Sequence, residues 1–168
     1  MNEMVVESVR VHMLSSQHVV ILKDTSRDRY LPIWIGSWEA NAIAMRLQGL
    51  TPERPLTHDL FSSTLTELGV TVKQIIVSDL ADETFRARLV LELDGRAVDI
   101  DARPSDAIAL AVRAGVPIYA TDAVLDRAAV APEPDEEEKL SVFRDFVNSL
   151  NLDLGDPPQG PEERRRLD

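Results

Sequence analysis

Two short segments each combine an arginine, a proline, a hydroxyl side chain and an aspartate at the expected start of a helix. They are residues 54–59, Arg-Pro-Leu-Thr-His-Asp, and residues 101–106, Asp-Ala-Arg-Pro-Ser-Asp. The start of a helix presents free backbone amides and a partial positive charge, which together favour a phosphate group. Arg54 and Arg103 could each add a bidentate contact to that phosphate, and Ser105 could add a hydroxyl. The pattern therefore predicts phosphate-binding sites at two helix starts.

Carboxylates and one histidine in or near these segments could carry the chemistry itself. Asp59 and Asp106 are suited to hold a divalent cation or to orient a water molecule. His58 adjoins Asp59 and could act as a general base near neutral pH, and Glu39 could serve as a ligand or a base. A structural explanation stands beside each role, because aspartate, glutamate, serine and threonine commonly begin helices. On the sequence alone, both interpretations stay open.

Two further aspartates, Asp99 and Asp101, share one face of an expected strand and could form a two-carboxylate metal site. The pair Asp94-Gly95 before them is a strong signal for a two-residue hairpin turn. This turn places Arg88 of the preceding strand opposite Asp101, so cross-strand pairing explains the pattern at least as well. We therefore expect a structural ion pair between Arg88 and Asp101.

The elements that must position these residues follow from hydrophobic periodicity. Alternating or continuous apolar runs predict strands, and apolar residues spaced three and four apart predict helices. The expected strands are residues 5–13, 19–23, 30–35, 72–78, 84–93, 98–102 and 116–120. The expected helices are residues 36–49, 57–69, 104–115 and 136–150. The fold class is therefore α+β, a mixed or antiparallel sheet with about three core helices and a C-terminal amphipathic helix.

Charge and composition divide the chain of 168 residues into three expected parts. Residues 1–130 should form the folded domain. Residues 131–150 are expected to be an acidic, proline-rich linker followed by the amphipathic helix, and residues 151–168 a disordered tail. Residues 131–168 hold 11 acidic and five basic side chains, so they contribute −6 to a net charge of −11.

Several functional classes are excluded or disfavoured by composition. The chain has no cysteine, which excludes disulfides, thiolate metal sites and thiol nucleophiles. No apolar run is long enough for a membrane span, and the first residues lack the pattern of a signal peptide, so we expect a cytoplasmic protein with no membrane partner. The acidic balance disfavours nucleic-acid binding mildly, although a bound cation would reverse the local sign.

Three motifs, met in order along the chain, resemble the bifunctional nuclease (BFN) domain family. They are residues 31–36 with 39–40 and 42–44, residues 54–60, and residues 101–110 with 116–119. The resemblance covers about residues 4–128 and nothing after Ala131. It implies an α+β domain of bacterial or plant type that associates with itself. The family takes its name from plant members similar to nucleases that act on both DNA and RNA.

The residues and the resemblance together lead to two hypotheses. The first is a nuclease that hydrolyses phosphodiester bonds of DNA, RNA or both with Mg²⁺ or Mn²⁺. Its phosphate-binding residues would be Arg54, Arg103 and Ser105, its metal ligands Asp59 and Asp106, and its catalytic residues Glu39, His58, Asp59 and Asp106. The second hypothesis is a non-enzymatic, oligomeric interaction or regulatory module in which the same residues brace helix starts. A catalytic site requires them to converge within ~10 Å around one open cleft.

We also expect a homodimer or a larger homo-oligomer. The apolar third helix and the short strands beside it present more apolar surface than three helices and one sheet can cover.

Overall fold

A mixed sheet is the frame of the computed structural model, which describes residues 1–12 and 14–132. Within these residues seven strands pair in the order β3-β2-β1-β7-β4-β5-β6. Their bounds are β1 Asn2–His12, β2 Gln17–Asp24, β3 Tyr30–Ile35, β4 Thr71–Ala81, β5 Thr84–Leu93, β6 Arg96–Ala102 and β7 Ile118–Ala120. All neighbours are antiparallel except β4 and β7, which are parallel. The mixed sheet confirms the predicted fold class.

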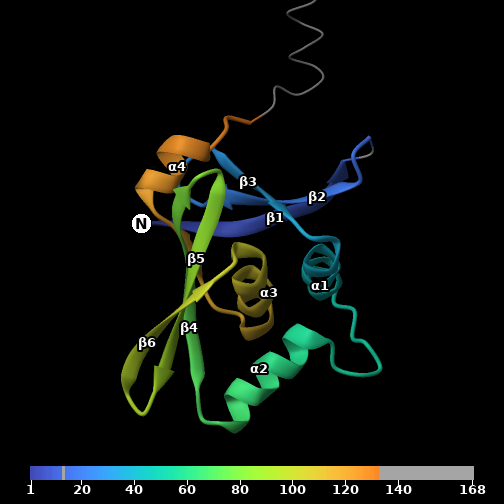
Figure 1. Ribbon diagram of the computed structural model, residues 1–168, viewed down its shortest axis with the longest axis vertical. Helices are drawn as coiled ribbons and strands as arrows, with labels where there is room; N and C mark the ends of the chain where they lie inside the picture. The colour runs from blue at the N-terminus through green and yellow to red at the C-terminus, as the bar shows by residue number, and fades with distance from the viewer. Residues whose placement is uncertain (13, 133–168) are drawn as a thin grey trace, which may run out of the picture. The chain divides into compact units, whose positions relative to one another are not determined.

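Four helices accompany the sheet in the part of the chain that the structure describes. They are α1 Ser37–Leu47, α2 Thr57–Glu67, α3 Pro104–Ala114 and α4 Asp122–Ala128. The first three were predicted, and α4 was not. Figure 1 shows α3 in the bend between the two halves of the twisted sheet, with α1 and α2 beside it. The C-terminal helix predicted over 136–150 and the tail predicted over 151–168 lie outside the described residues.

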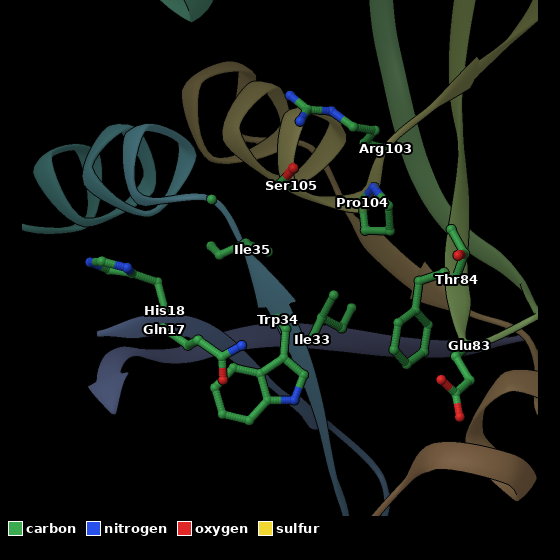
Figure 2. A pocket seen from close by; sticks show the side chains of 12 residues that line it. Gln17, His18, Ile33, Trp34, Ile35, Glu83, Thr84, Arg103, Pro104 and Ser105 are labelled. Atoms are coloured by element: carbon green, nitrogen blue, oxygen red, sulfur yellow. The ribbon is translucent and has the colours of Figure 1, made fainter. Parts of the chain in front are cut away.

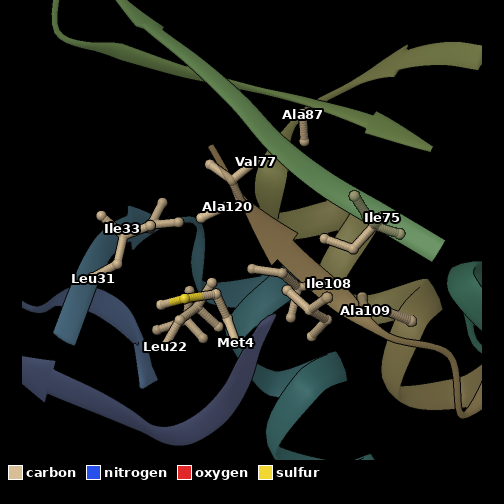
Figure 3. Close-up of a cluster of buried hydrophobic side chains, with 14 of the residues drawn as sticks. Met4, Leu22, Leu31, Ile33, Ile75, Val77, Ala87, Ile108, Ala109 and Ala120 are labelled. Carbon is tan, nitrogen blue, oxygen red and sulfur yellow. The ribbon is translucent and has the colours of Figure 1, made fainter. Parts of the chain in front are cut away.

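The core forms where α3 packs against the sheet. Residues 107–111 of α3 are all buried, as predicted for a helix that is apolar all round. Figure 3 shows Ile108 of α3 among side chains of the sheet, including Leu22 and Ile75. Because the chain reverses at Gly115 in a left-handed conformation (φ 67°), α3 ends there and β7 returns into the centre of the sheet. The start of α3 is thus fixed on a rigid support.

The β5–β6 hairpin has the predicted register, but its ion pair differs from the prediction. Asp94 and Gly95 both have positive φ, and Arg88 lies opposite Asp101. The Arg88 guanidinium nevertheless bonds the diagonal neighbour Asp99, with 2.9 Å from Nη1 to Oδ2. The predicted Arg88–Asp101 pair is therefore wrong, because a long arginine side chain reaches two residues along the adjacent strand.

Helix length also bears on membrane association. No helix within residues 1–12 and 14–132 is both long and apolar enough to cross a membrane.

Candidate functional site

Four charged or titratable side chains from three helices form a continuous network at the start of α3. The Arg103 guanidinium donates from Nε to Asp106 Oδ2 over 2.8 Å and from Nη2 to Glu39 Oε1 over 2.7 Å. The second oxygen of Asp106 lies 2.9 Å from His58 Nε2. Four predicted site residues, Glu39, His58, Arg103 and Asp106, are therefore linked one to the next although up to 67 residues separate them.

Local sequence explains why each member lies where it does. Arg103 is the N-cap of α3, and Pro104 fills the first helical position, where a missing N–H has no cost. His58 and Glu39 lie in the first turns of α2 and α1. Gly36 precedes α1, and a Cβ there would collide with the Glu39 carboxylate. The three helix starts therefore meet at one place because α1 and α2 both pack against α3.

The network carries a net negative charge. Hydrogen bonds, first from its own backbone amide and then from Arg103, lower the pKa of the Glu39 carboxyl despite burial. Burial alone would raise the pKa of Asp106, but hydrogen bonds from Arg103 and His58 lower it. Those same carboxylates, Asp106 foremost, raise the pKa of Arg103. Two carboxylates against one guanidinium leave a charge of −1 while His58 is neutral.

The structure places Asp59 in a second, separate ion pair. Its Oδ1 accepts from Arg113 Nε over 2.6 Å, and its Oδ2 accepts from the Leu56 amide over 2.9 Å. The Arg113 guanidinium also donates to the Ala42 and Ala109 carbonyls, so it ties α1, α2 and α3 together. Asp59 thus caps α2, which begins at Thr57 as the predicted bounds have it.

The two remaining phosphate-site predictions have different surroundings. Arg54 is exposed in the loop between α1 and α2, and no ion pair joins it to any residue that the structure describes. Ser105 is only 6% exposed, in the first turn of α3. Its hydroxyl makes no hydrogen bond to the described residues, so Ser105 does not serve as a helix cap.

A cavity of about 400 Å³ opens beside Arg103 and Ser105. It lies between the end of β3, the start of α3 and the β4–β5 turn (Figure 2). Its walls include Gln17, His18, Trp34, Glu83, Thr84, Phe85, Arg103, Pro104 and Ser105. A volume of this size is within the range of small-molecule sites, ~300–1,000 Å³.

The predicted metal ligands do not come together. Asp59 bonds Arg113, whereas Asp106 bonds Arg103 and His58. Across residues 1–12 and 14–132, no three histidine, aspartate or glutamate side chains are grouped so that they could hold a metal ion. The donor set as arranged does not fit Mg²⁺ or Mn²⁺, which take several carboxylate, carbonyl or water oxygens.

Sequence reasoning missed two contributors to this region. Arg113 was not considered, although a basic residue in the last turn of α3 was visible in the sequence. Trp34 was noted only as part of a motif, and its exposure on the cavity wall was not predicted. Tertiary packing alone reveals its position, because periodicity gives the face of an edge strand but not what lies beyond it.

The fold and the network define a domain in which a sheet-backed helix presents an arginine, flanked by carboxylates, at the edge of a cavity. The chain belongs to the bifunctional nuclease domain family, which matches residues 20–133. It is 42% identical over 162 residues to an uncharacterized protein of Mycobacterium tuberculosis, covering 91% of this chain and 97% of that protein.

Similarity also extends to a protein of rice, Oryza sativa subsp. indica, called bifunctional nuclease 1. The two are 25% identical over 114 residues, which is 66% of this chain and 34% of the rice protein. A protein of Oryza minuta called bifunctional nuclease matches to the same extent. This chain therefore resembles about a third of each plant protein.

Proposed function

We propose that this protein hydrolyses phosphodiester bonds of nucleic acid at the start of α3. The observation that carries the proposal is the network that joins Glu39, His58, Arg103 and Asp106, of which Arg103 lines the cavity. The family and the names of the plant relatives support a nuclease-like activity.

Arg103 is the group suited to contact the phosphate. Its side chain is 66% exposed although both Asp106 and Glu39 hold it, so its position is fixed without being covered. A guanidinium oriented in advance loses little freedom on binding and stabilises the negative charge that develops on phosphate oxygens during attack. The free amides of the first turn of α3 act in the same direction.

His58 is the group suited to move a proton. When its Nε2 carries hydrogen and donates to Asp106, its Nδ1 has a lone pair that accepts a proton from the attacking water. The water oxygen then bonds phosphorus and the phosphorus–oxygen bond to the leaving group breaks. The leaving oxygen takes up a proton from solvent water, and the imidazolium of His58 returns its proton to solvent. Asp106 acts as a positioning residue, as a carboxylate does when it orients a catalytic imidazole.

Purified protein tests this proposal with labelled single-stranded DNA, duplex DNA and RNA. We expect His58→Gln, Asp106→Asn and Arg103→Ala each to lower the cleavage rate ~100-fold or more, the usual effect of losing a general base or a charge-stabilising group. Asp126→Asn, at an exposed position of α4, is the matched control and should retain full activity. Equal cleavage by all variants would identify a contaminating nuclease and contradict the proposal.

Dependence on Mg²⁺ or Mn²⁺ stays a prediction and forms a separate arm of the same assay. Titration with each ion, and removal with EDTA, measures it directly. A rate that rises with either ion and disappears with EDTA would mean that the carboxylates rearrange around a cation. Cleavage that continues in EDTA would contradict metal dependence and leave the Arg103–His58 chemistry in place.

A non-enzymatic interaction module is the second candidate, and one observation favours it. Each carboxylate of the network is already engaged by an arginine, as expected for residues that brace helix starts. Helix α2 has no buried residue and exposes Leu60 and Phe61, which suits contact with a second copy. Absence of cleavage under every condition above, together with self-association, would support this candidate.

A further inference from the structure

Trp34 is a large aromatic residue that the fold leaves exposed on a cavity wall. It lies on β3, an edge strand of the sheet, and 57% of its surface is exposed. The His12 ring meets the indole edge-on, with 6.4 Å between ring centroids and 73° between planes. Trp34 also lines the cavity, and more than half of its surface is exposed, so indole surface is available to a ligand there.

Another wall of the same cavity carries polar groups from the start of α3. Figure 2 shows Arg103 and Ser105 on the α3 side and Trp34 on the β3 side. Ser105 is 6% exposed, yet its hydroxyl has no hydrogen-bond partner among residues 1–12 and 14–132. Ser105 also lines the cavity, so a ligand there could exchange a hydrogen bond with this hydroxyl. The amides of Ser105 and Asp106 are also free, because the first turn of a helix has no internal acceptors for them.

We propose that this cavity binds one nucleotide unit of a single-stranded nucleic acid, with the base stacked on Trp34 and its phosphate at Arg103 and Ser105. The inference rests on the proposed nuclease function and names the substrate class of that site. Every base has a π face, so stacking on Trp34 accepts any sequence. Gln17 lies on the same wall and supplies an amide that can bond base edges.

The geometry selects against an intact duplex. A base inside a double helix is stacked on both sides, and it must leave the stack before an indole can contact its face. Glu83 on the cavity rim disfavours a second phosphate there, which leaves the Arg103 end as the phosphate end. Single strands and splayed ends are therefore the ligands that fit.

The chain offers a matched pair of tryptophans for the test. It has two, Trp34 and Trp38, and Trp38 is 84% exposed but does not line the cavity. In Trp38→Phe the remaining fluorescence reports Trp34, and in Trp34→Phe it reports Trp38. Titration uses a single-stranded oligothymidylate with phosphorothioate linkages, which resist cleavage, an abasic oligomer of the same length, and a blunt duplex.

We expect the single strand to quench Trp34 fluorescence and to leave Trp38 fluorescence unchanged. Trp34→Ala should weaken single-strand binding about 5- to 150-fold, which corresponds to the loss of one stacked base. Trp38→Ala should bind like the wild type. The abasic oligomer should bind more weakly to the wild type and be insensitive to Trp34→Ala, and the duplex should not quench Trp34.

Binding at Trp34 and hydrolysis are measured separately, so either can fail without the other. If Trp34→Ala binds single strands as tightly as Trp38→Ala does, or if no oligomer binds, the base site is wrong. Cleavage by the wild type, measured separately, decides the proposed function. Quenching of Trp34 fluorescence without cleavage would support the binding site and contradict hydrolysis. Cleavage by Trp34→Ala at the wild-type rate would support hydrolysis and contradict the base site.

Discussion

Arg103 organises the charged network through two hydrogen bonds to carboxylates that would otherwise repel each other. If it does so, Arg103→Ala should raise the pKa of both Glu39 and Asp106. For Asp106 the effect should be pronounced, because burial already opposes its ionised form and only His58 would remain as a partner. Carbon-13 NMR titration of the side-chain carboxyls measures both values.

Two further variants serve as controls for the pKa measurement. Arg103→Lys keeps the charge without the planar fork, so the pKa values should rise by a smaller amount. Arg88→Ala removes an arginine from the exposed Arg88–Asp99 pair. It should leave the pKa values of Glu39 and Asp106 unchanged. If Glu39 and Asp106 have the same pKa values in Arg103→Ala as in the wild type, Arg103 does not bridge them.

Asp24 is a buried carboxylate with a structural role, unlike the carboxylates of the candidate site. It is 1% exposed and accepts bonds from Ser26, the Arg27 amide and Arg29. Burial alone would raise its pKa, but these hydrogen bonds lower it to about 2. A group whose pKa is lowered by folding stabilises the fold above its unfolded pKa and loses that contribution on acidification.

We therefore expect Asp24 to contribute about 2 kcal/mol at neutral pH, lost as the pH falls from ~4 to 2. Asp24→Asn should destabilise the fold by ~3–5 kcal/mol at pH 7, because it leaves the nearly buried Arg29 unpaired. It should also flatten the pH dependence in that window. Urea unfolding at several pH values tests both effects against Asp126→Asn, and parallel curves for the two variants would contradict them.

The two hairpin turns on either side of β5 have the same left-handed backbone at their central positions, but with different residues. Asp94 and Gly95 have φ of 50° and 74° between β5 and β6, and Asp82 and Glu83 have φ of 48° and 60° between β4 and β5. Left-handed backbone at both central positions matches the twist of a hairpin. It costs a residue with a Cβ roughly 1–2 kcal/mol, and glycine much less.

Glu83→Gly should therefore increase the free energy of unfolding by about 0.5–1 kcal/mol, after the greater freedom of glycine in the unfolded chain is deducted. Gly95→Ala should decrease it by about 1 kcal/mol, and since no atom lies within 4 Å of the added Cβ, the cost is that of the backbone alone. Urea unfolding measures both. A Glu83→Gly variant no more stable than the wild type would show that the Asp82-Glu83 turn is not strained.

The sequence predicted elements better than it predicted contacts between them. The Asp94-Gly95 turn fixed the register of β5 and β6, since turn length determines pairing. Helix α4 was missed because it has only seven residues, although Thr121, whose side chain accepts from the Val124 amide, was a usable cap signal. The His58–Asp106 contact could not be predicted, because it joins residues 48 apart through packing of α2 on α3.

The exposed apolar surface of α2 and of its C-cap, Leu68, predicts self-association. Leu60 and Leu68 are 62% and 68% exposed, and Phe61 between them is 45% exposed. Apolar clusters on a small domain commonly mark an interface. Light scattering at micromolar concentration should give at least twice the chain mass of 18.7 kDa.

A double variant identifies the face involved. Leu60→Asp with Leu68→Asp should lower the mass to one chain by placing unpaired charges in the interface. Val130→Asp, also at an exposed apolar position, should leave the oligomer intact. A single-chain mass for the wild type would contradict self-association, and dissociation by Val130→Asp alone would move the interface away from α2.

The uneven charge of the whole chain leads to the last prediction. Residues 131–168 carry −6 of the net −11, and four consecutive acidic residues occupy 135–138. A negative segment tethered to a domain that binds phosphate competes with nucleic acid for its cationic groups, Arg103 above all. Deletion of residues 131–168 should therefore raise affinity for a single-stranded oligonucleotide, most strongly at low salt, where charges are least screened.

Charge and length must be separated for this test to be decisive. Replacing residues 135–138 by their amides, Asn-Gln-Gln-Gln, keeps the tail but removes four charges, and it should reproduce much of the gain. Fluorescence anisotropy across a salt series measures both variants beside the wild type. Since a competing charge acts through the Coulomb term, the three affinities should converge as salt rises. Equal affinities at every salt concentration would mean that the acidic tail does not regulate the site.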